Sequence, residues 1–395
     1  EQAVASGTDA RRHPLFFINW MWKKPAASLV DYERTSVPIA QQSNIEIRTD
    51  GVSDVEAEKA RVDALGSDIS DYPIIVKDIK KVYPALDGGQ PKVAVRTMTL
   101  GIQRGECFGL LGPNGAGKTT CIGMLTGFLE PTAGTGIVEG LDISTDMPSI
   151  YKIMGVCPQH DLLWEQLSAR EHLQFYGRLK GMNGKELDEM CDAGLKSVNL
   201  FNAGVGDKLS GKYSGGMKRR LSVAISFMGS PKVVYLDECS TGLDPASRRT
   251  LWDVIKASKA GRSIILTTHS MEEAEVLCDR LGIFVDGQLV CIGNPKEITS
   301  RYAGYLVFSI SVPPEQEAAA RALVLSMSPS ATLTYALGGT LKYELPTTEV
   351  TLSKVFEAIN ASKDQLTIVD WGVANATLEE VFIKLAKSAG ATSKD

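Results

Sequence analysis

The amino-acid sequence predicts an α/β fold with a mixed sheet core and a helical subdomain, followed by a small α+β domain. Short apolar runs alternate with helical patterns from about residue 74 to residue 301. A glycine-rich loop at Gly112–Thr119 follows one of these runs and precedes a helical stretch. The last part of the chain has the order strand–helix–strand–strand–helix–strand. Continuous apolar runs are typical of strands that helices cover on both faces.

Length and composition limit the function classes. A chain of 395 residues predicts two or three domains, because single cores rarely grow beyond about 250–300 residues. The net charge of −5 and a pI near 5.6 give no basic face for nucleic acid. Seven scattered cysteines without a C-x-x-C pair favour a reducing cytosol. No apolar run approaches the ~20 residues that span a bilayer.

Residues 1–72 predict a separate juxtamembrane linker or interfacial segment. Leu15–Trp22 is apolar and aromatic and has cationic residues on both sides, as in segments that lie at a membrane surface. A linker with a few buried aromatics fits the same residues, and both interpretations stay open. Val52–Leu65 has the spacing of a short helix. Because the chain opens with Glu1, we expect it to be a piece of a longer polypeptide.

Residues 73–301 predict the central domain, whose buried strands are the short apolar runs. These are Ile74–Val76, Cys107–Leu111, Ile153–Val156, Val233–Leu236 and Ile264–Leu266. The segment Ile283–Cys291 places Asp286-Gly287 between two apolar strands, which predicts a hairpin.

Residues 302–395 predict a ferredoxin-like domain. Its elements are a strand at Leu306–Val312, a helix from Pro313 to Met327, strands near Leu333 and Leu341, a helix at Leu352–Ile359, a strand at Leu366–Trp371 and a helix from Thr377. Thr377 and Glu380 form a capping box at the last helix. This domain carries no catalytic constellation, so we expect a regulatory or dimer-stabilising role.

The loop Gly112–Thr119 is a full G-x-x-x-x-G-K-T match, which predicts a nucleotide phosphate site. Lys118 is expected to reach the β- and γ-phosphates, and Thr119 to place its hydroxyl on Mg²⁺. The backbone N–H groups of the loop form the anion-binding concavity. The remaining residues expected at the nucleotide are Asn114, Gly115, Ala116, Gly117 and, at the α-phosphate, Thr120. The alternative is a glycine-rich turn with a surface lysine.

Polar residues follow three other predicted strands. Asp237 is expected to hold Mg²⁺ through water, and Glu238 to act as general base or to position water. Gln159 is expected to bind Mg²⁺ or the attacking water, and His269 to donate to the γ-phosphate. Open α/β sheets bind ligands at the carboxyl ends of their strands, which favours these roles over ordinary loop positions. Tyr83 is the candidate for stacking on the adenine ring, although an aromatic that only packs in a strand fits as well.

The stretch Tyr213–Met217 contains Ser214, Gly215 and Gly216, which have no role inside a single nucleotide site. We expect them to complete the site of a second copy. The sequence therefore predicts a domain that dimerises around nucleotide.

Together these motifs resemble the nucleotide-binding domain of an ATP-binding-cassette protein, a P-loop NTPase. The resemblance implies ATP and Mg²⁺ as ligands, ATP hydrolysis, and Ser214, Gly215 and Gly216 acting on the nucleotide of a second, identical or related cassette. It also implies that the Ser240–Asp244 loop communicates between the two sites. A narrower set of segments is similar to the A subfamily of lipid exporters: Gly105–Gly112, Cys157–Asp161, Arg170–Leu173, His269–Glu273 and Thr377–Phe382. The stretch Tyr213–Leu221 resembles the plant or algal branch of that subfamily.

The resemblance implies an ATPase module on the cytosolic face of a membrane, joined in one longer polypeptide to transmembrane domains that bind a lipid substrate. Two alternatives stay open: a soluble cassette ATPase without a transport role, and a non-hydrolysing regulatory cassette. The chain departs from the wider family at Met217, where Gln is usual, and at Cys239, where Pro is usual. We expect the missing proline to loosen the following loop. We also expect ATP to protect Cys121 and Cys239 from alkylation, although two inert buried cysteines fit the same residues.

Overall fold

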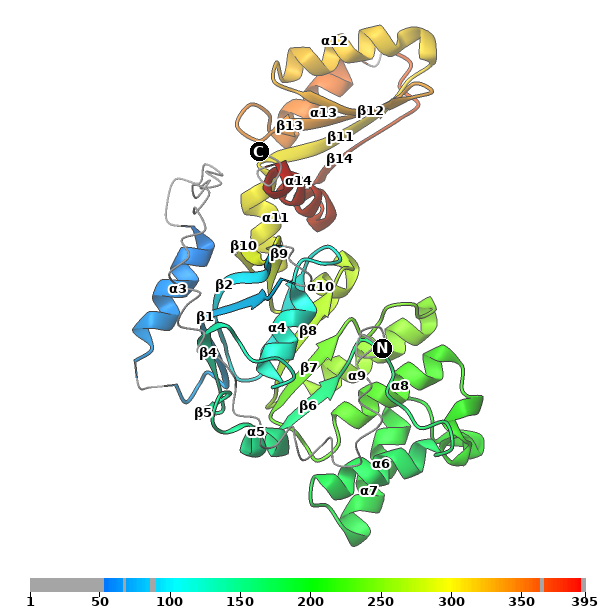
Figure 1. Ribbon diagram of the computed structural model, residues 1–395. Helices are drawn as coiled ribbons and strands as arrows, with labels where there is room; N and C mark the ends of the chain where they lie inside the picture. The colour runs from blue at the N-terminus through cyan, green and yellow to red at the C-terminus, as the bar shows by residue number, and fades with distance from the viewer. Residues whose placement is uncertain (1–52, 67–68, 86–89, 363–365, 392–395) are drawn as a thin grey trace. The chain divides into compact units, whose positions relative to one another are not determined.

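The computed structural model describes residues 53–66, 69–85, 90–362 and 366–391 (Figure 1). The aromatic segment Leu15–Trp22 and its predicted place at a membrane surface lie outside these residues. None of the helices in the described ranges is both long enough and apolar enough to cross a membrane.

A ten-stranded sheet with the order β5-β4-β1-β2-β10-β9-β3-β8-β7-β6 forms the central domain. The strands are β1 (Ile74–Tyr83), β2 (Lys92–Ile102), β3 (Cys107–Leu111), β4 (Ala133–Val138), β5 (Leu141–Asp142), β6 (Met154–Cys157), β7 (Val233–Asp237), β8 (Ser263–Thr268), β9 (Arg280–Val285) and β10 (Gln288–Gly293). Four of the five apolar runs named from the sequence lie within one of these strands. The fifth, Ile153–Val156, begins one residue too early, because Ile153 ends helix α5 (Met147–Ile153) and β6 starts at Met154. The hairpin is confirmed: Asp286 and Gly287 join β9 to β10 with φ angles of 46° and 77°.

The sheet has a parallel and an antiparallel part. β3, β8, β7 and β6 run parallel to their neighbours, so their carboxyl ends meet at one edge. β1 pairs antiparallel with β2 and with β4. The sequence did not indicate β2, whose first residues are partly exposed, because exposed polar positions interrupt its apolar pattern. The parallel strands β3, β7 and β8 are buried along their whole length and are therefore easier to recognise.

Some helices of the central domain cover the sheet, and others form a separate group beside it. The helices of the central domain are α3 (Asp54–Ala64), α4 (Lys118–Leu125), α5 (Met147–Ile153), α6 (Ala169–Leu179), α7 (Gly184–Ser197), α8 (Gly215–Ser226), α9 (Pro245–Ser258), α10 (Met271–Leu277) and α11 (Pro295–Ala303), with 3-10 turns η2 (Asn202–Asp207) and η3 (Ser210–Lys212). α6, α7 and α8 pack on one another (Figure 1). A capping box starts α6, because Ser168 accepts from the Glu171 backbone and the Glu171 carboxylate accepts from that of Ser168.

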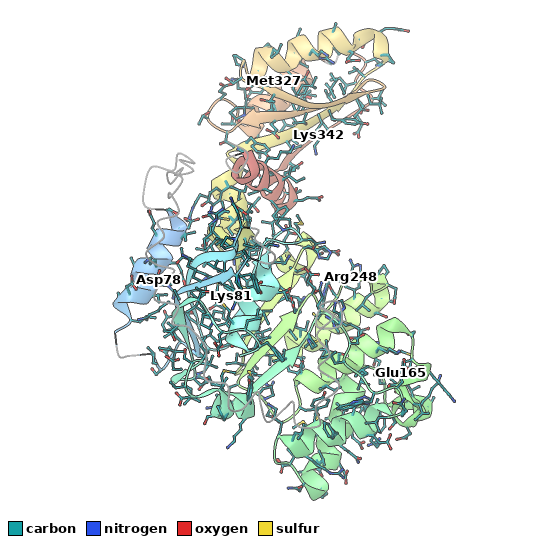
Figure 2. The ribbon with its side chains drawn as sticks, in the orientation of Figure 1. Asp78, Lys81, Glu165, Arg248, Met327 and Lys342 are labelled. Carbon is teal, nitrogen blue, oxygen red and sulfur yellow. The ribbon has the colours of Figure 1, made fainter. Side chains whose placement is uncertain are left out.

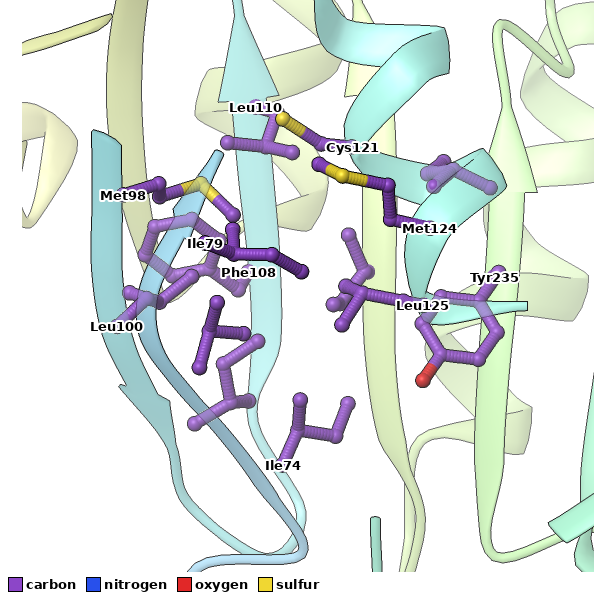
Figure 3. Close-up of a cluster of buried hydrophobic side chains, with 14 of the residues drawn as sticks. Ile74, Ile79, Met98, Leu100, Phe108, Leu110, Cys121, Met124, Leu125 and Tyr235 are labelled. Carbon is purple, nitrogen blue, oxygen red and sulfur yellow. The ribbon is translucent and has the colours of Figure 1, made fainter. Parts of the chain in front are cut away.

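The main core lies between α4 and the strands on which it packs. Figure 3 shows Cys121, Met124 and Leu125 of α4 facing side chains of the sheet, including Phe108 and Leu110 of β3. All five residues are nearly inaccessible to solvent. This packing fixes the start of α4, where the phosphate loop ends.

Helix α3 is joined to the sheet by a buried carboxylate. Glu58 is 7 % exposed and accepts from the Gly101 backbone at 3.0 Å. It also pairs with Arg61 at 2.5 Å and with Arg280 of β9 at 3.2 Å. Because two cations and a backbone donor meet this carboxylate, its burial is compensated. The predicted short helix is thus present and packs on β2 and β10.

The C-terminal region forms its own sheet with the order β12-β13-β11-β14, every neighbouring pair antiparallel. Its elements are β11 (Tyr305–Ser311), η4 (Pro314–Gln316), α12 (Glu317–Met327), β12 (Thr332–Leu337), β13 (Thr340–Pro346), α13 (Leu352–Ser362), β14 (Asp370–Asn375) and α14 (Leu378–Ala391). This is the predicted ferredoxin-like order. The capping box is present, with Thr377 and Glu380 bonded reciprocally at 2.9 and 3.3 Å.

One strand of this region differs from the prediction. The apolar run Leu366–Trp371 predicts a strand, but β14 begins only at Asp370. Pairing with β11 runs from Ser311 opposite Asp370 to Leu306 opposite Asn375, and this partner sets the register. The apolar residues before Asp370 belong to the segment that leads into β14. In this segment Leu366 is buried and Val369 is 72 % exposed.

Candidate functional site

The phosphate loop joins β3 to α4 and needs glycine at two close approaches. A Cβ atom on Gly112 would lie 2.3 Å from the Phe284 carbonyl oxygen, and one on Gly117 would lie 2.3 Å from that of Ala94. Gly117 also has a φ of +106°, a conformation that side chains disfavour. The β9–β10 turn braces the loop, since the Gly287 N–H donates to the Ala116 carbonyl at 3.0 Å. These close approaches and this hydrogen bond fix the backbone path of the loop.

The Lys118 ammonium lies inside this loop. Its side chain is 4 % exposed, and Nζ donates to the carbonyls of Gly112 at 2.8 Å and Pro113 at 3.1 Å. The Glu238 carboxylate lies 3.4 Å from the same nitrogen. A buried cation that faces carbonyls and one carboxylate can donate its hydrogen bonds to phosphate oxygens instead.

Asp237 ends β7 and points toward two hydroxyl groups. Its Oδ1 accepts from Thr119 at 3.3 Å and from Thr267 of β8 at 2.5 Å. A hydroxyl and a carboxylate are oxygen donors of the kind that Mg²⁺ prefers, and Mg²⁺ keeps several waters. The pair Thr119 and Asp237 therefore fits the predicted Mg²⁺ contact. No cluster of three or more His, Cys, Asp or Glu side chains suited to a metal occurs in the described ranges, so any Mg²⁺ would need water and phosphate as further ligands.

Three predicted residues, Lys118, Gln159 and His269, meet at the Glu238 carboxylate. The Gln159 amide donates to Glu238 Oε2 at 3.0 Å, and His269 Nδ1 lies 3.7 Å from the same oxygen. Glu238 is 6 % exposed and has a φ of +46°, in the left-handed region. Because of this turn, Glu238 faces Lys118 and Gln159 while Asp237 faces Thr119. The two adjacent acids thus occupy different parts of the site.

Tyr83 lies at the end of β1 beside the first turn of α4. Its hydroxyl is 3.5 Å from the Thr120 hydroxyl. The ammonium of Lys81, labelled in Figure 2, lies 5.4 Å from the centre of the Tyr83 ring. Tyr83 is half-buried and therefore keeps one part of its ring accessible. Asn114 is exposed in the phosphate loop, and its side chain makes no hydrogen bond to any residue that the structure describes.

The Ser214–Gly216 motif lies elsewhere, at the start of α8. The Ser214 hydroxyl caps this helix by accepting from the Met217 N–H at 3.3 Å. Ser214 and Gly215 are exposed, whereas Gly216 lies close to Ser247 and Asp244 at the start of α9. No hydrogen bond or ion pair within the described ranges connects this motif to the phosphate loop. The structure thus does not bring it together with Lys118 in one chain.

Sequence reasoning missed two residues of this region. Thr267 bonds Asp237, and its Oγ1 also accepts from the Glu238 N–H at 3.0 Å. Arg219 of α8 is 4 % exposed and bonds the carbonyls on both sides of Glu238. A signal was present, because Arg219 shares a helix face with the apolar or small residues Ser222 and Val223. A charge on such a face needs specific partners.

The expectation that ATP shields two thiols from alkylation is not supported. Cys121 and Cys239 are both fully buried by the protein itself. Burial raises the pKa of the Cys121 thiol to about 12 and that of Cys239 well above its usual value. Both residues are packing residues, since the reactive form of cysteine is the thiolate. The Cys239 carbonyl is also anchored by Arg219 at 2.7 Å, which restrains the loop that lacks proline.

Comparisons with known proteins agree with this geometry. The family model described as ABC transporter matches residues 95–241, and the model described as ABCA12-like, C-terminal domain, matches residues 306–356. ABC transporter A family member 7 of Arabidopsis thaliana is 53 % identical over 96 % of this chain, and member 5 is 57 % identical over 86 %. These matches cover 40 % and 36 % of the two relatives.

Solved structures support the fold. A dimeric post-hydrolysis state of the ATP-binding cassette MJ0796, bound to ADP and Pi, aligns with a TM-score of 0.52 at 21 % identity. The alignment covers 56 % of this chain and 98 % of that one. An ATP-binding subunit of an ABC transporter aligns with a TM-score of 0.52 at 28 % identity, over 58 % and 92 % of the two chains.

Proposed function

This chain carries the nucleotide-binding domain of an A-family ABC transporter, and from that premise we propose that it binds Mg-ATP, dimerises around it and hydrolyses it to drive lipid transport. ATP hydrolysis is the known activity of this fold. The observation that carries the proposal is the meeting of Lys118, Gln159 and His269 at the Glu238 carboxylate. These groups come from the loop after β3 and from the carboxyl ends of three parallel strands.

Each residue has a distinct part in the proposed reaction. The γ-phosphate takes the place of the loop carbonyls at Lys118, whose cation stabilises the charge that develops during hydrolysis. Freed from Lys118, the Glu238 carboxylate accepts a proton from the attacking water, while Gln159 orients that water. His269, on the exposed side of Glu238, donates to a phosphate oxygen. When bound, Mg²⁺ neutralises phosphate charge, and Thr119 and Asp237, with Gln159 nearby, would hold it.

Dimerisation accounts for the exposed Ser214 and Gly215. In the proposed dimer, the helix start at Ser214 approaches the γ-phosphate held by Lys118 of the other cassette. Backbone N–H groups and the positive end of α8 favour an anion there. Two such contacts related by a twofold axis complete two sites, with a second copy or a related cassette as the partner.

A docking surface for transmembrane domains is supported by exposed apolar residues near Gln159. Leu162 is 69 % and Trp164 45 % exposed in the segment that follows Gln159. Trp164 packs edge-on against Phe175 of α6 with ring centres 5.0 Å apart. Exposed aromatic clusters of this kind mark interaction sites. We place the membrane domains of the same longer polypeptide here, with the cassette on the cytosolic face. Lipid as the transported substrate rests on the relatives alone.

The test is Mg-ATP turnover by the 395-residue chain and by its Glu238→Gln variant. We expect the turnover per protein molecule to rise with protein concentration. Glu238→Gln should lose at least ~100-fold in kcat while it accumulates as an ATP-bound dimer. Glu272→Gln, which removes a surface carboxylate of α10, is the matched control and keeps full activity. Equal turnover of wild type and Glu238→Gln would refute the catalytic role of Glu238, and an absence of turnover in the wild type would favour the non-hydrolysing alternative. The longer polypeptide decides the transport role: six or twelve membrane spans are expected, and none would favour a soluble ATPase.

A further inference from the structure

The guanidinium of Arg219 makes four hydrogen bonds inside the protein. Nε donates to the Cys239 carbonyl at 2.7 Å, and Nη2 donates to the Asp237 carbonyl at 2.8 Å. Nη1 donates to the Pro158 carbonyl at 2.6 Å and to the Asp161 carboxylate at 3.2 Å. All three nitrogens of the planar guanidinium are therefore engaged in a geometry that only arginine offers.

Two of these acceptors enclose the proposed general base. The carbonyls of Asp237 and Cys239 belong to the residues immediately before and after Glu238. The backbone of Glu238 has a φ of +46°, which is uncommon for a residue with a side chain. Hydrogen bonds on both neighbouring carbonyls hold the chain in this turn, and the turn aims the Glu238 carboxylate at Lys118. Arg219 therefore fixes the direction of Glu238.

A third acceptor fixes Gln159. The Pro158 carbonyl belongs to the residue before Gln159, whose amide bonds Glu238 at 3.0 Å. Arg219 thus holds the backbone of both partners in this hydrogen bond. Asp161, which follows in the same loop, also accepts from Ser222 of α8 at 2.8 Å. Helix α8 consequently holds the Gln159 loop at two points, one turn apart.

If Arg219 served only to neutralise a buried charge, fewer of its contacts would be explained than if it also held the backbone. Asp161 is the one carboxylate that Arg219 contacts in the described ranges, and it is the longest of the four bonds. The three shorter bonds go to backbone carbonyls at the ends of two neighbouring strands, β6 and β7. A buried cation that bonds carbonyls at a reaction centre restrains the backbone there rather than forming a simple ion pair.

We propose that Arg219 is a positioning residue for ATP hydrolysis, acting through Glu238 and Gln159. It lies five residues after Ser214 on the same helix. The groups that act on the nucleotide of this cassette are thereby tied to the motif that acts on the nucleotide of the partner. The inference rests on the proposed role of Glu238 in hydrolysis.

Arg219→Lys tests the proposal in the 395-residue chain. Lysine keeps the charge but cannot bond three carbonyls in one plane. We expect kcat for Mg-ATP to fall ~10- to 100-fold, as misplacement of a catalytic group by ~1 Å does, with KM and the dissociation constant for ATP within ~3-fold of wild type. The matched control is Arg220→Lys. Arg220 is the next residue of α8 and bonds the Val198 carbonyl at 2.8 Å, away from Glu238.

A second measurement separates positioning from loss of folding. In the Glu238→Gln background, Arg219→Lys should leave the residual rate within ~2-fold, because the group through which Arg219 acts is already disabled. An unchanged kcat in Arg219→Lys, a fall equal to that of Arg220→Lys, or independent effects in the double variant would overturn the proposal. If Arg219→Lys does not fold, Arg219→Gln is measured in its place. If that variant does not fold either, Asp161→Asn is measured. An unchanged kcat in the variant that is measured would overturn the proposal in the same way. Failure of the proposed function looks different, since Glu238→Gln would then hydrolyse ATP like the wild type.

Discussion

The side-chain amide of Gln159 and the carboxylate of Glu238 are joined by a hydrogen bond of 3.0 Å across the ends of two parallel strands. The residues lie 79 positions apart in the sequence. Gln159 is exposed in its loop, whereas Glu238 is 6 % exposed. A movement of the Gln159 loop therefore alters the surroundings of Glu238 directly. Hydrolysis and contact with a membrane domain can be linked through this bond.

Replacing Gln159 should slow hydrolysis while ATP still binds. In Gln159→Ala the Glu238 carboxylate loses its amide donor and the attacking water loses one orienting group. We expect kcat to fall ~10-fold or more, with the ATP dissociation constant within ~3-fold, because Lys118 and its loop are untouched. His160→Ala changes the exposed neighbour and serves as control. A kcat in Gln159→Ala equal to that of the control would contradict this role.

Replacing Lys118 should affect both binding and stability. Lys118→Met removes the phosphate partner, and we expect a fluorescent ATP analogue to bind at least ~100-fold more weakly. The variant also leaves Glu238 buried without its cation, which lowers the free energy of unfolding by about 1–3 kcal/mol. The double variant with Glu238→Gln should regain stability but not ATP affinity. Chemical denaturation without nucleotide checks this, and equal stability of the two variants would refute the Lys118–Glu238 contact.

Tyr83 is tested by separating its ring from its hydroxyl. If the ring stacks on adenine, Tyr83→Ala should weaken ATP binding by about 1–2 kcal/mol, roughly 5- to 30-fold, as for base stacking on other aromatics. Tyr83→Phe keeps the ring and loses only the 3.5 Å contact with Thr120, so its affinity should change less than ~3-fold. Isothermal titration with ATP and with inorganic triphosphate gives the comparison. An equal loss for both ligands would show that Tyr83 supports the loop instead.

Asp54 should hold α3 to the end of α11. Its carboxylate accepts from the Tyr302 hydroxyl at 2.8 Å and pairs with Arg301, and it is 11 % exposed. Asp54→Ala is expected to lower the opening free energy of α3 amides in hydrogen exchange by about 1–3 kcal/mol. Lys59→Ala is the control on the same helix. Its exposed pair with Asp78 (labelled in Figure 2) should contribute less than ~1 kcal/mol. Similar effects of the two changes would count against the Asp54 contact.

The buried thiols predict a loss of stability in alkali. Burial raises the pKa of Cys121, Cys157 and Cys291 to about 12, from 9.0. Between pH 9 and 12 the unfolded chain releases these protons and the folded chain retains them. The unfolded state is therefore stabilised relative to the folded state as the pH rises. Each thiol lowers the free energy of unfolding by about 1.4 kcal/mol per pH unit in that window and has no effect below it. Denaturation at several pH values checks this, and Cys121→Ala should reduce the slope.

Thiol labelling gives an independent measurement of the same burial. A maleimide should modify Cys121 and Cys239 of the folded chain slowly, and at the same rate with and without ATP. Full labelling is expected only after denaturation. ATP-dependent protection of either residue would show that it becomes accessible during the nucleotide cycle.

The sequence alone determined much of this protein because its decisive signals are local. The spacing of Gly112, Gly117 and Lys118 is set by how one loop surrounds phosphate, and the parallel strands are apolar because both faces are covered. The order of elements in the C-terminal region likewise followed from local periodicity and a capping box.

Only the tertiary structure decided which distant residues share a contact. Arg219 looked like one more cation of a helix until folding brought the carbonyls of Pro158, Asp237 and Cys239 around it. The start of β14 depended on its partner β11, and the inertness of Cys121 and Cys239 depended on complete burial. Such properties arise from neighbours far apart in the chain, because burial and hydrogen-bond partners are set by packing and not by the residue's own segment.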